Sequence, residues 1–213
     1  MSRHVRVSHL LLSSCLYVLT FNDDIARRIS AASSAFGRLE SRLWNERGVR
    51  RSTKIAVYHA VVIATLLHGC ESWTTYRHNI CSLDQFHMRC LRPITRIKWQ
   101  DKIPNTEVLH LCAISGIEAF IIRAQIRWVG HVYRMPNSRI SKAVFYSELQ
   151  SGSRPQGRPK QCYKDNLKTN MQFTGIDSQT WEDLAGDRSN WRKTCLTGVQ
   201  HFEENRIASA MEK

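Results

Sequence analysis

Apolar residues recur at the spacing of a helix face along much of this chain, and this limits the folds open to it. Steps of four, three, four, three and four residues in one run match the 3.6-residue period of an α-helix. Similar runs follow later in the chain. We therefore predict an all-α fold, with a three-helix bundle followed by a second helical region joined by a basic Gly/Pro linker. The run is Ile25, Ile29, Ala32, Phe36, Leu39 and Leu43.

The other two helices of the bundle differ in how apolar they are. Residues 52–68 contain TKIAVYHAVVIATLL, which is apolar on nearly all sides and predicts a central buried helix ended by Gly69. Residues 77–91 have one apolar side, and Pro93 should end that helix because proline lacks the N–H of the helical hydrogen bond. The inward residues expected there are Ile80, Leu83, Phe86 or His87, Cys90 and Leu91.

Phe21-Asn22-Asp23-Asp24 has the F/Y-x-D-D form of the reverse-transcriptase catalytic box, whose carboxylates hold two metal ions. That box requires a strand on each side and a partner aspartate from an earlier strand. Here a helical pattern follows, and residues 1–22 contain no aspartate. We therefore interpret residues 22–24 as the cap and first turn of the first helix, and expect no catalysis from this chain.

Residues 1–21 start with the basic stretch MSRHVR and continue with the apolar run VSHLLLSSCLYVLT. This run is too short to span a membrane as a helix, and no membrane partner is expected. Two interpretations stay open, a degraded strand and a targeting leader. The polar interruption at His9 and the lack of a small-x-small cleavage site before Phe21 count against a targeting leader.

The chain is strongly basic, with 31 Lys and Arg against 18 Asp and Glu and a net charge of +13. Such a chain usually meets a polyanion, and nucleic acid is the leading candidate. Residues 27–54 hold eight basic and two acidic side chains, and residues 121–168 hold ten and two. Beyond Asn170 the balance reverses, with five basic against seven acidic side chains. The expected nucleic-acid surfaces therefore lie before that point.

The seven cysteines form no CxxC pair, and an odd number of them indicates free, buried thiols in a reducing intracellular compartment, nuclear or cytoplasmic. The tightest Cys/His group is Cys81, His87 and Cys90. Its spacing matches no common zinc module, so we interpret these residues as core and expect no metal or other cofactor.

Several sequence segments, taken in order, resemble the C-terminal region of LINE-type (non-LTR) retrotransposon reverse transcriptases, downstream of the polymerase palm. They are IARRI-x-x-A-x-x-AFGRL, TKIAVY-x-AVV, LLHGCESWT, LDQFHMRCLR, IKWQDKIPNTEVL, RW-x-GHV-x-RM and GRPK followed by YKD. The resemblance implies a thumb-like bundle over residues 22–100, preceded by the leader. It then implies a basic helical region (101–149), a linker (150–160) and C-terminal helices (161–213), without the endonuclease, the palm or a terminal zinc finger.

In polymerases of this kind the thumb holds the template-primer duplex mainly through phosphate and sugar contacts. The resemblance therefore implies that backbone contacts come from the loop between the first two helices, although a plain solvated basic loop is nearly as good an interpretation. The residues concerned are Arg47, Arg50, Arg51 and Lys54.

A further helix follows Gly116 and carries the RW-x-GHV-x-RM segment. Arg123, Arg127 and Arg134 form a stripe roughly 16 Å long at 1.5 Å per residue, which suits two or three phosphates. Trp128 is interpreted as core rather than as a platform for a base, and His131 as a packing or hydrogen-bonding residue. The expected core positions are Ile117, Phe120, Ile121, Ala124, Trp128 and His131 or Val132.

The segment SGSRPQGRPKQ cannot form a packed core and predicts an exposed linker. It resembles an AT-hook, which inserts arginines into the minor groove, but Gln156 replaces the first arginine of that motif. A solvated linker is the alternative to weak binding through Arg154, Arg158 and Lys160.

The last part of the chain predicts three helices, with Trp181, Leu184 and Trp191 packed together. The expected activity of the whole is sequence-nonspecific, salt-sensitive binding to RNA, DNA or an RNA–DNA hybrid, with no small-molecule substrate. The alternatives are a helical protein-interaction module anchored by the Trp181 and Trp191 region, and a transposon remnant without a function.

Overall fold

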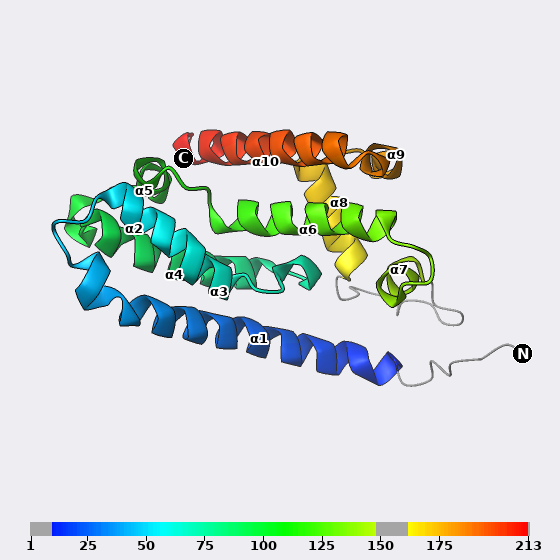
Figure 1. Ribbon diagram of the computed structural model, residues 1–213, viewed down its shortest axis with the longest axis horizontal. Helices are drawn as coiled ribbons and strands as arrows, with labels where there is room; N and C mark the ends of the chain where they lie inside the picture. The colour runs from blue at the N-terminus through cyan, green and yellow to red at the C-terminus, as the bar shows by residue number, and fades with distance from the viewer. Residues whose placement is uncertain (1–9, 148–161, 213) are drawn as a thin grey trace, which may run out of the picture.

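A computed structural model of the chain describes residues 10–147 and 162–212, and every regular element in those residues is a helix (Figure 1). The prediction of an all-α fold is confirmed. The α-helices are α1 Leu10–Arg38, α2 Arg51–Val57, α3 Ala64–Leu66, α4 Arg77–Thr95, α5 Asn105–Cys112, α6 Ile117–Arg134, α7 Ile140–Tyr146, α8 Tyr163–Phe173, α9 Trp181–Gly186 and α10 Arg188–Met211. Two π-helical segments, η1 Glu40–Trp44 and η2 Tyr58–Ile63, and two 3₁₀ turns, η3 Cys70–Ser72 and η4 Trp99–Asp101, complete the set.

The first helix starts further upstream than the sequence predicted. Helix α1 begins at Leu10, so residues 10–21 are helical and the strand interpretation was wrong for them. Asn22 is mid-helix rather than a cap, because the preceding turn already supplies partners for the backbone N–H groups. Its Oδ1 instead accepts a hydrogen bond from Asn79 Nδ2 at 2.9 Å. Asp23 and Asp24 therefore lie on a continuous helix, without the strands of a catalytic box.

The first core lies among α1, the α2–η2–α3 run, α4, α5 and the start of α6. The run from residue 51 to 66 is one helical stretch that widens to π-helical spacing in its middle. Tyr58, Leu66, Leu83 and Leu91 are fully buried there. Gly69 then adopts a left-handed φ of 81°, which a glycine tolerates, so the predicted end of this helix is confirmed.

Helix α4 continues past Pro93 to Thr95, so the predicted stop was wrong by about one turn. A proline removes one helical hydrogen bond, and the turn that remains is held by other contacts. Thr95 Oγ1 donates to the carbonyl of Leu91 at 2.9 Å. Arg96 then ends the helix in the left-handed region at a φ of 60°. The expected inward side of this helix is buried, including both His87 and Phe86.

The second core lies among α6, α8, α9 and α10. Trp181 and Trp191 pack with ring centroids 6.1 Å apart, and Leu184 lies against them, as predicted. Helix α6 contributes to both cores: Ile121 belongs to the first, and Ile126 to the second. It is therefore the element that joins the two halves of the molecule (Figure 1).

Buried thiols are a feature of both cores. Cys70, Cys90, Cys112 and Cys195 are free and buried, which confirms the core interpretation for these four, whereas Cys81 is exposed. Within residues 10–147 and 162–212, no group of three or more His, Cys, Asp or Glu side chains is arranged to hold a metal ion.

No single helix in the described part of the chain is long and apolar enough to cross a membrane. Helices α5 and α6 meet the length and composition requirement only as a pair, and the break between them bends by 64°.

Candidate nucleic-acid interface

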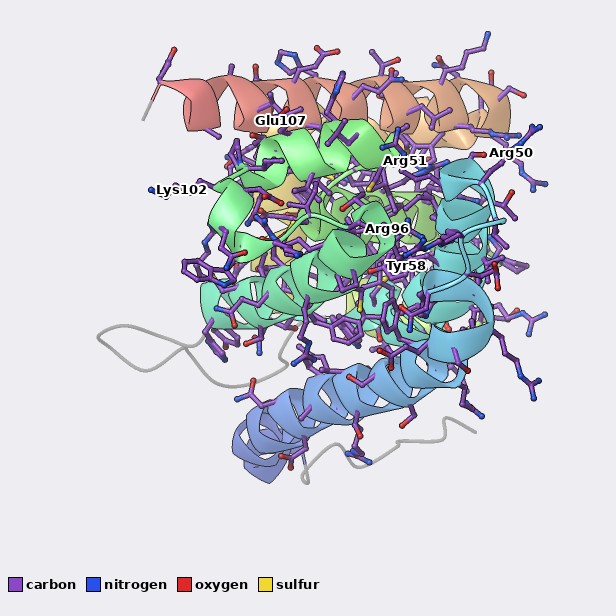
Figure 2. The ribbon with its side chains drawn as sticks, turned by 90° about the vertical axis from the view of Figure 1, so that its left-hand side faces the viewer. Arg50, Arg51, Tyr58, Arg96, Lys102 and Glu107 are labelled. Carbon is purple, nitrogen blue, oxygen red and sulfur yellow. The ribbon has the colours of Figure 1, made fainter. Side chains whose placement is uncertain are left out.

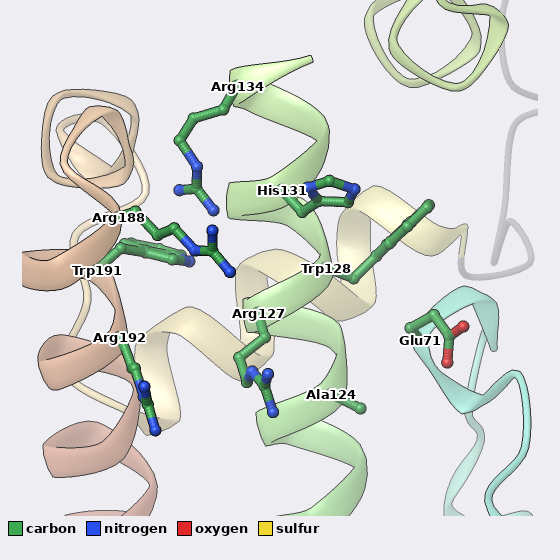
Figure 3. A pocket seen from close by; sticks show the side chains of 9 residues that line it. All are labelled: Glu71, Ala124, Arg127, Trp128, His131, Arg134, Arg188, Trp191 and Arg192. Carbon is green, nitrogen blue, oxygen red and sulfur yellow. The ribbon is translucent and has the colours of Figure 1, made fainter.

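An open groove of about 590 Å³ runs over the exposed face of α6, between the start of α10 and the turn η3 (Figure 3). It brings together residues that lie more than 100 positions apart in the sequence. Most of the side chains that line it are cationic or aromatic, and one is acidic. The lining residues are Glu71, Ala124, Arg127, Trp128, His131, Arg134, Arg188, Trp191 and Arg192.

The close approach of α10 to α6 depends on Gly130 in the middle of the RW-x-GHV-x-RM segment. Trp191 lies across this glycine, is 2% exposed, and donates from Nε1 to the carbonyl of Ile126 at 3.2 Å. A Cβ on Gly130 would lie 2.5 Å from Cδ1 of the indole and closer still to Nε1. Only a glycine therefore admits the indole at this depth, and Trp191 sets where the first turns of α10 lie.

That placement turns two arginines of α10 into the groove. Arg188 and Arg192 are four residues apart, on either side of Trp191, and both are exposed. Helix α10 starts at this point because Asp187 caps it, accepting from the N–H of Ser189 at 2.8 Å. Neither arginine was predicted from the sequence as a contact, since the region after Asn170 is acidic overall. Their spacing around a core tryptophan was the signal available.

Helix α6 supplies the facing cations. Arg127 is exposed in the groove, whereas Arg134 is half-buried and donates from Nη1 to the carbonyl of Ala185 at 2.6 Å. Arg123 is exposed on the same helix but does not line the groove. Among the described residues, none of these three arginines forms a salt bridge. The predicted stripe is thus divided: Arg127 lies in the groove, Arg134 is anchored at its edge, and Arg123 lies outside it.

Trp128 and His131 lie in the groove, which corrects the core interpretation of both residues. Trp128 is half-buried and His131 is exposed, with ring centroids 5.7 Å apart and planes tilted by 55°. The face of α6 that is buried in the second core is a neighbouring one, which includes Ile126 and Val129. Trp128 and His131 therefore lie outside that core. Gln125, which is fully buried, takes an inward position beside Ile126 and Val129.

The wall formed by η3 is fixed by polar contacts from the second half of the chain. Gln125 Nε2 donates to the carbonyl of Trp73 at 2.8 Å and to that of Cys70 at 3.3 Å. Asn170 Nδ2 donates in turn to Gln125 Oε1 at 2.6 Å, and Tyr163 Oη donates to the backbone carbonyl of Glu71 at 2.9 Å. These bonds hold the backbone that carries the Glu71 carboxylate.

The chemistry of the groove is divided between its two sides. Figure 3 shows Arg188 and Arg192 on the α10 side, and Trp128, His131 and Glu71 toward the η3 side, with Arg127 between them. Anions are therefore favoured on the α10 side, while the opposite side offers ring faces and a hydrogen-bond acceptor.

The basic loop predicted as a phosphate surface lies at the other end of the molecule. Arg47, Arg50 and Arg51 are exposed there, and Figure 2 shows the last two at the start of α2, on the same end as Arg96 and Lys102. The structure brings none of them to the groove.

Lys54 is not available as a contact, contrary to the sequence prediction. It is 3% exposed, and its Nζ donates to the carbonyls of Trp44 and Glu46, each at 2.7 Å. The carbonyls at the end of a helical segment need donors, and Lys54 supplies them for η1. Its position one turn before the buried Tyr58 was the sequence signal for this role.

The linker residues Arg154, Arg158 and Lys160 lie outside the described residues. The Trp181 and Trp191 region, named above as the anchor of an interaction module, is described and is buried within the second core. Those two indoles are therefore not surface anchors in this structure.

No family model and no solved structure matches this chain. The chain is 22% identical over 179 residues to a protein of Caenorhabditis elegans whose name describes it as uncharacterized and transposon-derived. The match covers 79% of this chain and 62% of the relative, so the chain spans less than two thirds of that protein. This weak similarity supports a transposon origin.

Proposed function

We propose that this protein binds RNA, DNA or an RNA–DNA hybrid without sequence preference, through the groove between α6 and α10. The observation that carries the proposal is the meeting of Arg127, Arg188 and Arg192 in one open groove, from two helices held together by Trp191. Arginines make charge-assisted hydrogen bonds with phosphates, and the two helices place these three on one surface. Arg134 adds positive charge at the edge of the groove.

We propose further that the chain derives from the C-terminal region of a LINE-type reverse transcriptase and acts without catalysis. The ordered sequence segments support this ancestry, and the transposon-derived relative is consistent with it. The absence of catalysis is inferred from Asp23 and Asp24, which lie within helix α1 rather than on a turn between strands. In such an enzyme this region holds the nucleic acid while the palm performs the chemistry. Its free core thiols fit the intracellular location that we propose.

Fluorescence anisotropy of a labelled RNA–DNA hybrid, measured at low and raised salt, tests the binding. We expect binding at low salt. The logarithm of the association constant should then fall linearly with the logarithm of the salt concentration. The triple variant R127Q/R188Q/R192Q should weaken binding and flatten that slope. Absence of wild-type binding at low salt would exclude the proposed function.

A matched control removes three charges elsewhere. The variant R27Q/R38Q/R42Q changes exposed arginines of α1 and η1, so it has the same net charge as the groove variant. It should keep most of the affinity if the groove is the binding site. Equal losses in the two triple variants would show that net charge alone attracts the nucleic acid.

A further inference from the structure

The groove contains more than a phosphate-binding surface requires. A double helix presents its phosphates to a groove of this kind and keeps its bases stacked inside. The ring face of Trp128 and the carboxylate of Glu71 therefore have no role in contacts with phosphates alone. A ring face and a carboxylate beside a row of arginines are instead complementary to a nucleotide whose base is unpaired.

We propose that the groove binds a single-stranded segment, with its phosphates along the α10 side and an unpaired base stacked on Trp128 beside His131. This inference rests on the proposed nucleic-acid binding and specifies the form of ligand that the same site takes. The ligand is the unpaired nucleotide, from either RNA or DNA.

The placement of the cations suits a strand that follows α10. Arg188 and Arg192 are one helical turn apart, or about 6 Å at 1.5 Å per residue, which is the order of separation of successive phosphates in an extended strand. Arg127 faces them from α6 across the groove. Trp128 and His131 line the same groove on the side away from α10.

Trp128 and His131 are carried by helix α6 rather than by a surface loop. Trp128 is half-buried and lies against His131, in the middle of a helix whose other faces belong to two cores. The backbone that carries the ring is therefore held in one place, which lowers the entropy cost of stacking a base on it. Stacking is tolerant of sequence because every base has a π-face.

The carboxylate of Glu71 adds a preference among bases. An anion beside Trp128 repels phosphate, so the group that faces it is the base edge. A carboxylate accepts hydrogen bonds and cannot donate them when ionised, and the exocyclic amines of cytosine, adenine and guanine are donors. Thymine and uracil lack such an amine, and their one donor on that edge, N3–H, lies between two carbonyl oxygens that a carboxylate repels. We therefore expect oligo-dC to bind more tightly than oligo-dT.

The test compares W128F and W128L by anisotropy, using a single-stranded 12-mer and a 12-base-pair duplex. Both variants keep an apolar side chain of intermediate size, and only phenylalanine keeps a ring face. We expect W128L to weaken single-strand binding roughly tenfold, W128F to stay within a factor of about three, and duplex binding to change little in either. Ribose and deoxyribose forms of the 12-mer show which sugar is preferred.

Each outcome bears on one of the two proposals. Wild-type protein that binds neither strand form would exclude the proposed function itself. Nucleic-acid binding that is equally strong in W128F and W128L would overturn the stacking inference and leave the proposed function standing. Equal losses for single strand and duplex would also overturn it. The variant E71A, which has no side-chain acceptor, should remove the preference for dC over dT, and a preference that persists in E71A would show that Glu71 does not face the base.

Discussion

Two groups of arginines lie toward opposite ends of the molecule (Figure 1). One belongs to the loop before α2 and the first residue of that helix, and comprises Arg47, Arg50 and Arg51. The other lines the groove and comprises Arg127, Arg188 and Arg192. The loop was the more conspicuous in the sequence, because its charges lie within five residues. The groove assembles its charges from two helices more than 50 residues apart, and adds an aromatic pair. Clustered charge in a sequence marks a basic surface, whereas the fold decides whether rings and cations form a site.

The substitution with the largest expected effect tests how tightly the groove is built. In G130A the new Cβ would overlap the indole of Trp191, so α10 must shift. We expect a loss of about 3 kcal/mol in the free energy of unfolding, together with weaker nucleic-acid binding. Urea unfolding followed by circular dichroism measures the first, and anisotropy the second.

The matched variant in the loop is G48A. The nearest atom to a Cβ there is Glu46 Oε1 at 3.7 Å, an ordinary contact, so the free energy of unfolding should change by no more than about 0.5 kcal/mol. Equal stability of G130A and G48A would show that the groove is not closely packed and would remove the difference between the two regions.

The core beneath the loop end should be sensitive to acid through His87. Burial lowers the pKa of His87 to about 4, and its Nδ1 is hydrogen-bonded to Tyr58 Oη at 2.8 Å. In the unfolded chain His87 is protonated below about pH 6.5, whereas in the folded chain it is protonated only below about pH 4. The free energy of unfolding should therefore fall by about 3 kcal/mol between these pH values and level off below them.

Urea unfolding of wild type and H87Q at several pH values checks this expectation. H87Q should be less stable at neutral pH but should lose the part of the pH dependence that belongs to His87. The difference between the two proteins cancels the contributions of Asp84 and Glu118, whose pKa values are raised by burial. Parallel pH profiles for the two proteins would assign the acid sensitivity to other groups.

A smaller effect is expected from Lys54, the buried cation of the loop region. K54M leaves the carbonyls of Trp44 and Glu46 without their donor, which should lower the free energy of unfolding by about 2 kcal/mol. The exposed neighbour gives the control, since R51M should change the free energy of unfolding by no more than about 0.5 kcal/mol. Loss of nucleic-acid affinity in K54M without loss of stability would restore the original interpretation of Lys54 as a phosphate contact.

Local patterns in the sequence were sufficient for much of the fold. The apolar spacing in α4 predicted its buried side, and Gly69 predicted the end of the preceding helix. These features depend on residues within one or two turns, where spacing and backbone conformation decide the result. The predicted start of α1 and the predicted stop of α4 at Pro93 were wrong. Cap and breaker rules weigh only the residues at a helix end, and a proline removes a single helical hydrogen bond.

The candidate site was harder to predict because it depends on contacts between distant segments. Trp128 follows the apolar spacing of α6, and only the packing of α10 against the neighbouring face shows that it points into a groove. Arg188 and Arg192 lie in a region that is acidic overall, so composition concealed them. Gly130 was part of the recognised segment, yet its role became clear only with Trp191 above it.

The central claim is that the groove, rather than the basic loop, binds nucleic acid. Its most direct test compares R127Q/R188Q/R192Q with R47Q/R50Q/R51Q, two variants of equal charge, by the salt dependence of their affinity for one single-stranded 12-mer. We expect the groove variant to lose about two units of the slope of log affinity against log salt, and the loop variant to lose little of it. A slope that falls in the loop variant and is unchanged in the groove variant would contradict this claim.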